Sequence, residues 1–191
     1  MIKHLTIAAF ALGMFTAPLA AAEPADAMTQ YVTEKVVAWL QTDDVVAAIT
    51  AKNAQTGALT VQEVDDLDRD WRAQVGQADK PLILSVLDTP LSASLADHVA
   101  GSGGMITEIF VMDSQGLNVA ASAVTSDYWQ GDEAKFQQTF DVGPGAVHVS
   151  EVELDESTQT YQAQVSVSLT DPATGALIGA VTFGLNAQAF F

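Results

Sequence analysis

The chain has 191 residues, of which 24 are acidic and 7 are basic, so its formal net charge is −17 at pH 7. This charge argues against a nucleic-acid-binding protein, which needs lysine and arginine to replace phosphate counterions, and against docking on an anionic membrane surface. Hydrophobic residues make up 49% of the chain, enough for a folded core, and the absence of cysteine excludes disulfides, thiolate metal sites and a catalytic cysteine.

Residues 1–22 have the pattern of a secretion signal. Lys3 and His4 form a weakly positive start, residues 5–19 are apolar or small, and residues 20–22 are alanines that suit a cleavage site. The apolar run is shorter than the roughly 20 residues that a membrane span needs. We therefore expect a periplasmic protein without stable membrane insertion after cleavage, the alternative being an uncleaved anchor.

The hydrophobic pattern predicts a helical part over residues 23–104. Apolar residues recur at three- and four-residue steps in most of it. Thr60 and Glu63 stand at the spacing of a capping box, which predicts the start of a helix. The expected segments are helices over 26–52, 60–76 and 91–100 and a short apolar stretch over 82–87.

From residue 105 on, the hydrophobic period changes from 3.6 to 2, which predicts a sheet over residues 105–191. The clearest alternation carries a polar row that either lines a pocket or faces water. That row consists of Gln162, Gln164, Ser166 and Ser168. The expected strands cover residues 106–113, 117–122, 146–154, 159–170 and 176–186, with a loop and a short helix in 126–140.

Three segments together resemble a known family. Residues 109–120 are similar to a strand–turn–strand motif D-x-x-G-x-x-V-A, residues 164–171 to a strand that ends in Asp, and residues 175–181 to a closing strand G-x-x-I-G-x-V. In this order they resemble the extracytoplasmic Cache family over about residues 28–186. The resemblance implies an α+β fold, with long N-terminal helices before a five-stranded antiparallel PAS/Cache-like sheet.

What the resemblance implies for function is ligand sensing. In Cache domains a small molecule lies between one face of the sheet and the connection of the second and third strands, which here is residues 123–145. Residues 125–135, TSDYWQGDEAK, are similar to a segment of stand-alone periplasmic sensor-type Cache proteins. Most family members carry their own membrane span and output domain, and we find neither in this sequence. We therefore expect this protein to pass its state to a membrane receptor or kinase.

The residue types in this connection suit a binding pocket. Aromatic rings supply walls, while carboxylates and amides orient a ligand; in the alternative, Tyr128 and Trp129 anchor the loop on the core and the acids are solvated. The predicted ligand-binding residues are Asp127, Tyr128, Trp129, Gln130, Asp132, Lys135, Tyr161, Gln164 and Asp171. For Asp171 the alternative is an ordinary turn former.

The charge of these residues limits the ligand class. Lys135 is the only lysine or arginine between Gly101 and Phe191, whereas a dicarboxylate normally needs at least two cationic donors. A neutral, zwitterionic or amine-bearing ligand therefore fits better. The alternative is a surface lysine that pairs with a nearby acid.

We expect no metal, no cofactor and no catalytic site. The acidic run that starts at Asp66 is similar to the start of a calcium loop, but Trp71 stands where that loop needs glycine. No nucleophile elbow or phosphate-binding loop occurs. Two alternatives to a sensor domain stay open: a ligand-free interaction or assembly module, with a homodimer through the N-terminal helix, and a hydrolase that uses carboxylates such as Asp127 or Asp132.

Overall fold

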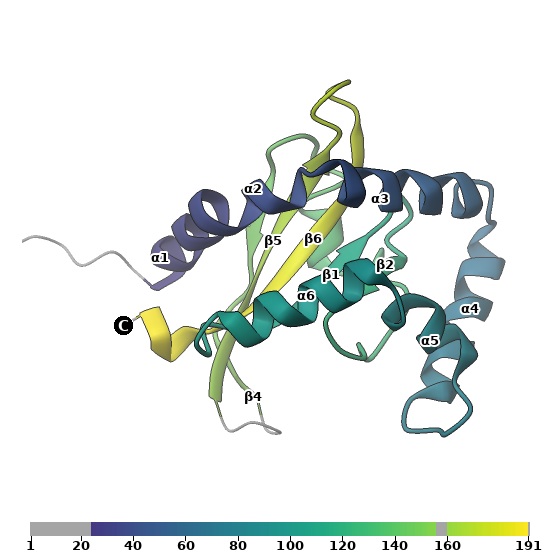
Figure 1. Ribbon diagram of the computed structural model, residues 1–191, viewed down its shortest axis with the longest axis horizontal. Helices are drawn as coiled ribbons and strands as arrows, with labels where there is room; N and C mark the ends of the chain where they lie inside the picture. Colours follow the sequence, from purple (N-terminus) through teal and green to yellow (C-terminus); the bar gives the residue numbers. More distant parts are fainter. Residues whose placement is uncertain (1–23, 156–159, 191) are drawn as a thin grey trace, which may run out of the picture.

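The computed structural model describes residues 24–155 and 160–190, and the predicted secretion signal, residues 1–22, lies outside them. In the described residues, helices precede an antiparallel sheet in the chain, and the helices Asp43–Thr56 and Pro90–Gly101 lie across one face of that sheet (Figure 1). The predicted α+β class is therefore confirmed.

The helix predicted over residues 26–52 is divided into several pieces. They are α1 (Pro24–Tyr31), the π-helical turn η1 (Val32–Val36), α2 (Val37–Leu40) and α3 (Asp43–Thr56). The chain leaves the helix at Thr42, whose extended backbone (φ −77°, ψ 154°) caps α3, and two acids follow in the first turn. The prediction of one continuous helix was wrong here, because threonine and aspartate favour a helix start over a helix interior.

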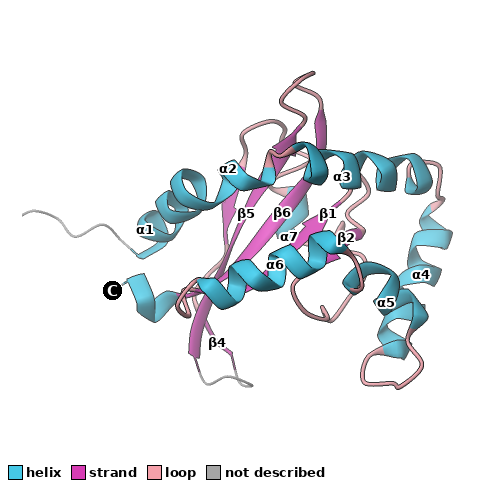
Figure 2. Cartoon of the chain, in the orientation of Figure 1, coloured by secondary structure: helices cyan, strands magenta, loops and turns pink. Residues whose placement is uncertain are grey.

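Helix α4 (Val61–Gln74) begins at the predicted capping box. The Thr60 hydroxyl accepts a hydrogen bond from the Glu63 amide, and the Glu63 carboxylate accepts one from the Thr60 amide. Helix α5 (Pro81–Leu87) replaces the apolar stretch predicted without a helix, and α6 (Pro90–Gly101) follows directly (Figure 2). Both start with proline, whose missing N–H costs nothing in a first turn.

The sheet has the strand order β2-β1-β6-β5-β3, with all neighbours antiparallel. Its strands are β1 (Ile106–Met112), β2 (Asn118–Ala121), β3 (Val147–Val149), β4 (Glu153–Asp155), β5 (Thr160–Thr170) and β6 (Leu177–Asn186). The predicted strand 146–154 is split into β3 and β4, which both pair with β5. Between them, the Ser150 hydroxyl accepts a hydrogen bond from the backbone N–H of Gln164 at 2.8 Å. A side chain thus takes the place of a backbone carbonyl in the strand pairing.

The two faces of the sheet carry different side chains, because successive residues of a strand point to opposite sides. The first face is apolar and packs under α1, α3 and α6, with Val165, Val181 and Phe183 fully buried. The second face is apolar only at one end, where Phe110 and Met112 pack with residues of α4, α5 and the 123–145 segment. The other end of the second face is polar, and this end positions the candidate site.

Candidate functional site

Polar side chains from three strands lie side by side on the second face. Ser166 of β5 and Thr182 of β6 are paired in register and fully buried, and their hydroxyl oxygens are 2.9 Å apart. Next to them, the side-chain amide of Gln164 donates a 3.0 Å hydrogen bond to the Glu108 carboxylate of β1. The polar row of β5 is thus buried or half-buried and not open to solvent, and two of its members, Gln162 and Gln164, line a hollow.

A hollow of about 530 Å³ lies at this polar end. The sheet, the β3–β4 connection and the 123–145 segment form its walls. Its polar lining residues are Glu108, Glu133, Lys135, Ser150, Glu151, Glu153, Gln162 and Gln164. Four carboxylates and one ammonium therefore share one small cavity.

Lys135 lies in the short helix α7 (Ala134–Gln137), and its side chain is only 14% exposed. Its ammonium is 3.0 Å from the Glu133 carboxylate, donates to the Gln130 side-chain oxygen at 3.1 Å and lies 5.3 Å from the centre of the Phe110 ring. Gln130 is buried and donates in turn to the backbone oxygen of Asp127. The lysine does pair with a nearby acid, as the alternative expected, but inside the hollow rather than on the surface.

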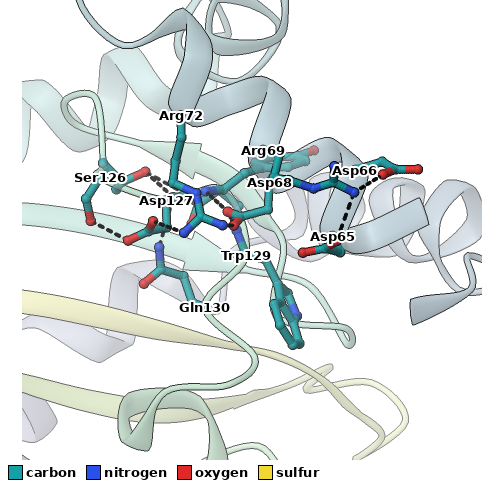
Figure 3. A network of polar contacts seen from close by, with 12 residues as sticks. Asp65, Asp66, Asp68, Arg69, Arg72, Ser126, Asp127, Trp129 and Gln130 are labelled. Atoms are coloured by element: carbon teal, nitrogen blue, oxygen red, sulfur yellow. Dashed lines mark hydrogen bonds and ion pairs between the residues drawn. The ribbon is translucent and has the colours of Figure 1, made fainter. Parts of the chain in front are cut away.

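The start of the 123–145 segment is fastened to helix α4 by a network of polar contacts (Figure 3). Asp68 is 4% exposed, and its carboxylate accepts hydrogen bonds from the backbone amides of Tyr128 (2.9 Å) and Trp129 (3.0 Å). Arg72 forms ion pairs with both Asp68 and Asp127. The Asp127 carboxylate is therefore bound to Arg72 of α4 and does not line the hollow.

The two aromatic residues predicted to bind ligand, Tyr128 and Trp129, pack in or against the core. Tyr128 is 1% exposed and stacks on Trp71, with ring centres 5.2 Å apart. Trp129 is half-buried, and its indole N–H donates to the backbone oxygen of Gln115 at 2.8 Å. Neither ring lines the polar hollow, so their position agrees with the anchoring alternative.

Three further predicted residues lie away from the hollow. Asp132 is exposed, and Tyr161 is 48% exposed at the start of β5. Asp171 lies in the β5–β6 turn, where the Ala173 amide and then the Thr174 hydroxyl donate to its carboxylate and lower its pKa. Asp171 thus has the bonding of a turn former.

The structure brings together only part of the predicted set, namely Gln130, Lys135 and Gln164. Sequence reasoning missed Glu108 and Glu133, which face the same hollow. Glu108 did give a signal, because it is the only charged residue within the apolar strand β1. A charge in such a position needs a polar partner or a polar cavity.

Within residues 24–155 and 160–190, no group of three or more histidine, aspartate or glutamate side chains could hold a metal ion. None of the helices in these ranges has the length and apolar character to cross a membrane.

No protein-family model matches the chain, and no curated protein sequence matches it. Several solved structures match it by fold. They are sensor and ligand-binding domains. One is an extracellular ligand-binding receptor from Desulfohalobium retbaense, with 14% identity over 76% of this chain and 25% of that one and a TM-score of 0.39.

Two further matches come from named sensors. The ligand-binding domain of the amino acid chemoreceptor PctC of Pseudomonas aeruginosa PAO1, in complex with GABA, is 13% identical over 68% of this chain and 57% of that one, with a TM-score of 0.39. The sensor domain of E. coli DcuS is 14% identical over 68% of this chain and 90% of that one, with a TM-score of 0.41. This chain spans 25% of the first matched chain and 57% of the second, which is less than two thirds of the length of each.

Proposed function

We propose that this protein is an extracytoplasmic sensor domain that binds a small amine-bearing molecule in the polar hollow and passes its state to a membrane receptor or kinase. The charge of the hollow supports this proposal more than any other observation. Four glutamates line it, and its one lysine is already paired with Glu133. The excess of carboxylates in a partly enclosed site attracts a cation such as a protonated amine.

The wall formed by the 123–145 segment allows one anionic or polar group on the ligand. The Lys135 ammonium has three N–H donors, of which Glu133 and Gln130 accept two. A ligand with one amine and one carboxylate can therefore place the amine near Glu108 and the carboxylate near Lys135. A dicarboxylate would set its second charge against the glutamates, which disfavours its binding.

The position of the walls supports a mechanism for signalling. Glu133 and Lys135 belong to the 123–145 segment, whereas Glu108 and Gln164 belong to the sheet. A ligand that contacts both walls stabilises the arrangement in which the segment lies against the sheet, and so shifts the population toward it. Because Asp68 of α4 holds the same segment, this shift extends to the helical layer.

A thermal-shift screen of the purified protein tests the proposal. The panel holds ethanolamine, putrescine, alanine and succinate. A ligand at 100 times its dissociation constant adds about 2.7 kcal/mol of stability, which is readily measured. We expect stabilisation by one of the amines and none by succinate.

Matched variants locate the site. We expect Glu108→Gln to abolish the amine-induced shift and the exposed Glu34→Gln to keep it. Stabilisation by succinate alone, or an amine shift that is unchanged in Glu108→Gln, would overturn the amine proposal. A folded protein that no compound stabilises would favour the interaction module instead.

A further inference from the structure

A second hollow, the α3–α6 groove, lies between helices α3 and α6, on the side of the sheet opposite to the polar hollow. Its volume is about 770 Å³, and it reaches down to Val119 of β2. Its apolar lining consists of Trp39, Val45, Ala47, Ala48, Ala51, Pro90, Leu91 and Val119. Clefts of this size with apolar walls and a few polar groups are typical of small-molecule sites. The proposed function does not use this groove.

One end of the groove carries a lysine without a carboxylate partner. Lys52 is half-buried, and its ammonium donates to the Tyr128 hydroxyl at 2.6 Å and lies 5.3 Å from the centre of that ring. Among residues 24–155 and 160–190, no carboxylate lies within 4.0 Å of it, although the chain is rich in acids. Of the other cations in these ranges, Arg69, Arg72 and Lys135 form ion pairs, whereas Lys35 and Lys80, which lie outside the groove, form none.

The other end of the groove is aromatic and acidic. The rings of Trp39 and His98 stack with their centres 3.9 Å apart and their planes at 11°. Asp44 also lines the groove there, eight residues before Lys52 in α3, which is about 12 Å along a helix. Helices α3 and α6 run in opposite directions (Figure 1), so His98 near the end of α6 lies at the Asp44 end of the groove. The groove therefore has a cationic end, an apolar middle and an anionic, aromatic end.

From this arrangement we infer that the groove is a second binding site, and that it takes an amphipathic monocarboxylate. The ligand carboxylate binds the spare N–H donors of Lys52. It supplies the negative charge that no acid of the described chain places beside this lysine. The apolar body lies along Ala48 and Leu91 toward the Trp39–His98 stack. Asp44 repels a ligand carboxylate at its end of the groove, so the ligand does not bind in the reverse orientation. For the same reason Asp44 disfavours dicarboxylates that would reach both ends.

Isothermal titration of the full protein with decanoate and with indole-3-acetate tests this inference. We expect at least one of them to bind, and 1-decanol, which keeps the apolar chain but lacks the carboxylate, to bind more weakly. Lys52→Met should weaken binding about 10-fold or more, as the loss of a charge-assisted hydrogen bond implies. The exposed Lys35→Met, which removes the same charge outside the groove, should leave it unchanged.

A second variant guards against an indirect effect of Lys52 on folding. Ala47 is exposed and lines the groove, so Ala47→Trp should fill the groove and abolish binding in a protein of unchanged stability. Glu108→Gln, in the other hollow, should not alter carboxylate binding, which separates this site from the amine site. The inference is overturned if neither carboxylate binds, or if binding survives both Lys52→Met and Ala47→Trp.

Discussion

The ammonium of Lys52 in α3 donates a 2.6 Å hydrogen bond to the phenolic oxygen of Tyr128, 76 residues further along the chain. This contact joins the helical layer to the 123–145 segment. On its other side, the Tyr128 ring stacks on Trp71 of α4. The segment that forms one wall of the polar hollow is therefore held by two helices, and Tyr128 lies between the two proposed sites.

Tyr128→Phe removes only the hydroxyl from this contact. A hydrogen bond to a charged donor contributes about 1.5–3 kcal/mol, so we expect a loss of unfolding free energy in that range, measured by urea denaturation. Tyr161→Phe is the matched control, because that ring is 48% exposed, and its effect should stay within about 0.5 kcal/mol. Equal stability of the two variants would contradict an energetic role for the Lys52 contact.

Asp68→Ala should be among the most destabilising changes in α4. The substitution leaves the amides of Tyr128 and Trp129 without their acceptor, and each unpaired buried donor costs about 1–3 kcal/mol. Asp68→Asn keeps an acceptor oxygen and should lose less. The control is Asp65→Ala, whose ion pair with Arg69 is exposed and contributes at most about 1 kcal/mol. Similar urea midpoints for Asp68→Ala and Asp65→Ala would count against the network.

Gly116→Ala tests the close packing of the β1–β2 turn against the 123–145 segment. Gly116 has φ +82°, and a Cβ there would lie 2.6 Å from backbone atoms of Gly131. We expect a loss of about 2–5 kcal/mol, from the left-handed backbone and from overpacking together. Gly103 has φ +66° but open space around it, so Gly103→Ala should cost only the backbone part, about 1–2 kcal/mol. A thermal melt that ranks Gly103→Ala as the worse variant would refute this.

His148 should make stability fall in mildly acidic solution. Burial lowers its pKa below 6.5, so in this range the unfolded chain binds the proton more readily than the folded protein. Unfolding free energy therefore decreases as the pH falls below about 6.5, whereas above that value the histidine is neutral in both states and has no effect. Urea titrations should show a flatter pH dependence for His148→Gln. An NMR titration of His148 with a pKa above 6.5 would contradict the sign.

Local signals were sufficient for much of the fold. The capping box of Thr60 and Glu63 marked the start of α4, and the change of hydrophobic period marked the passage from helices to strands. The alternation along β5 also predicted which of its residues share a face. These features follow from the chain itself, because a cap or a period depends on residues within one or two turns of each other.

Two element boundaries were missed, for different reasons. The helix break at Thr42 has a local signal, threonine followed by two aspartates, that the apolar periodicity of residues 26–52 obscured, whereas the division of the third strand at Ser150 depends on a tertiary contact. At Ser150 the deciding contact is a hydrogen bond from Gln164, which is 14 residues away. A pattern read within one segment contains no information about such a partner.

The candidate site depends most on tertiary structure. The sequence by itself determined the acidic charge, the lack of cysteine and the concentration of polar and aromatic residues in the 123–145 segment. Only the folded chain decided that Tyr128 turns into the core while Lys135 turns into the polar hollow. The reason is that Asp68 and Lys52 hold Tyr128 from 60 and 76 residues away, and the Lys135 ammonium lies over the ring of Phe110 from a different strand. Burial of a side chain depends on what packs against it.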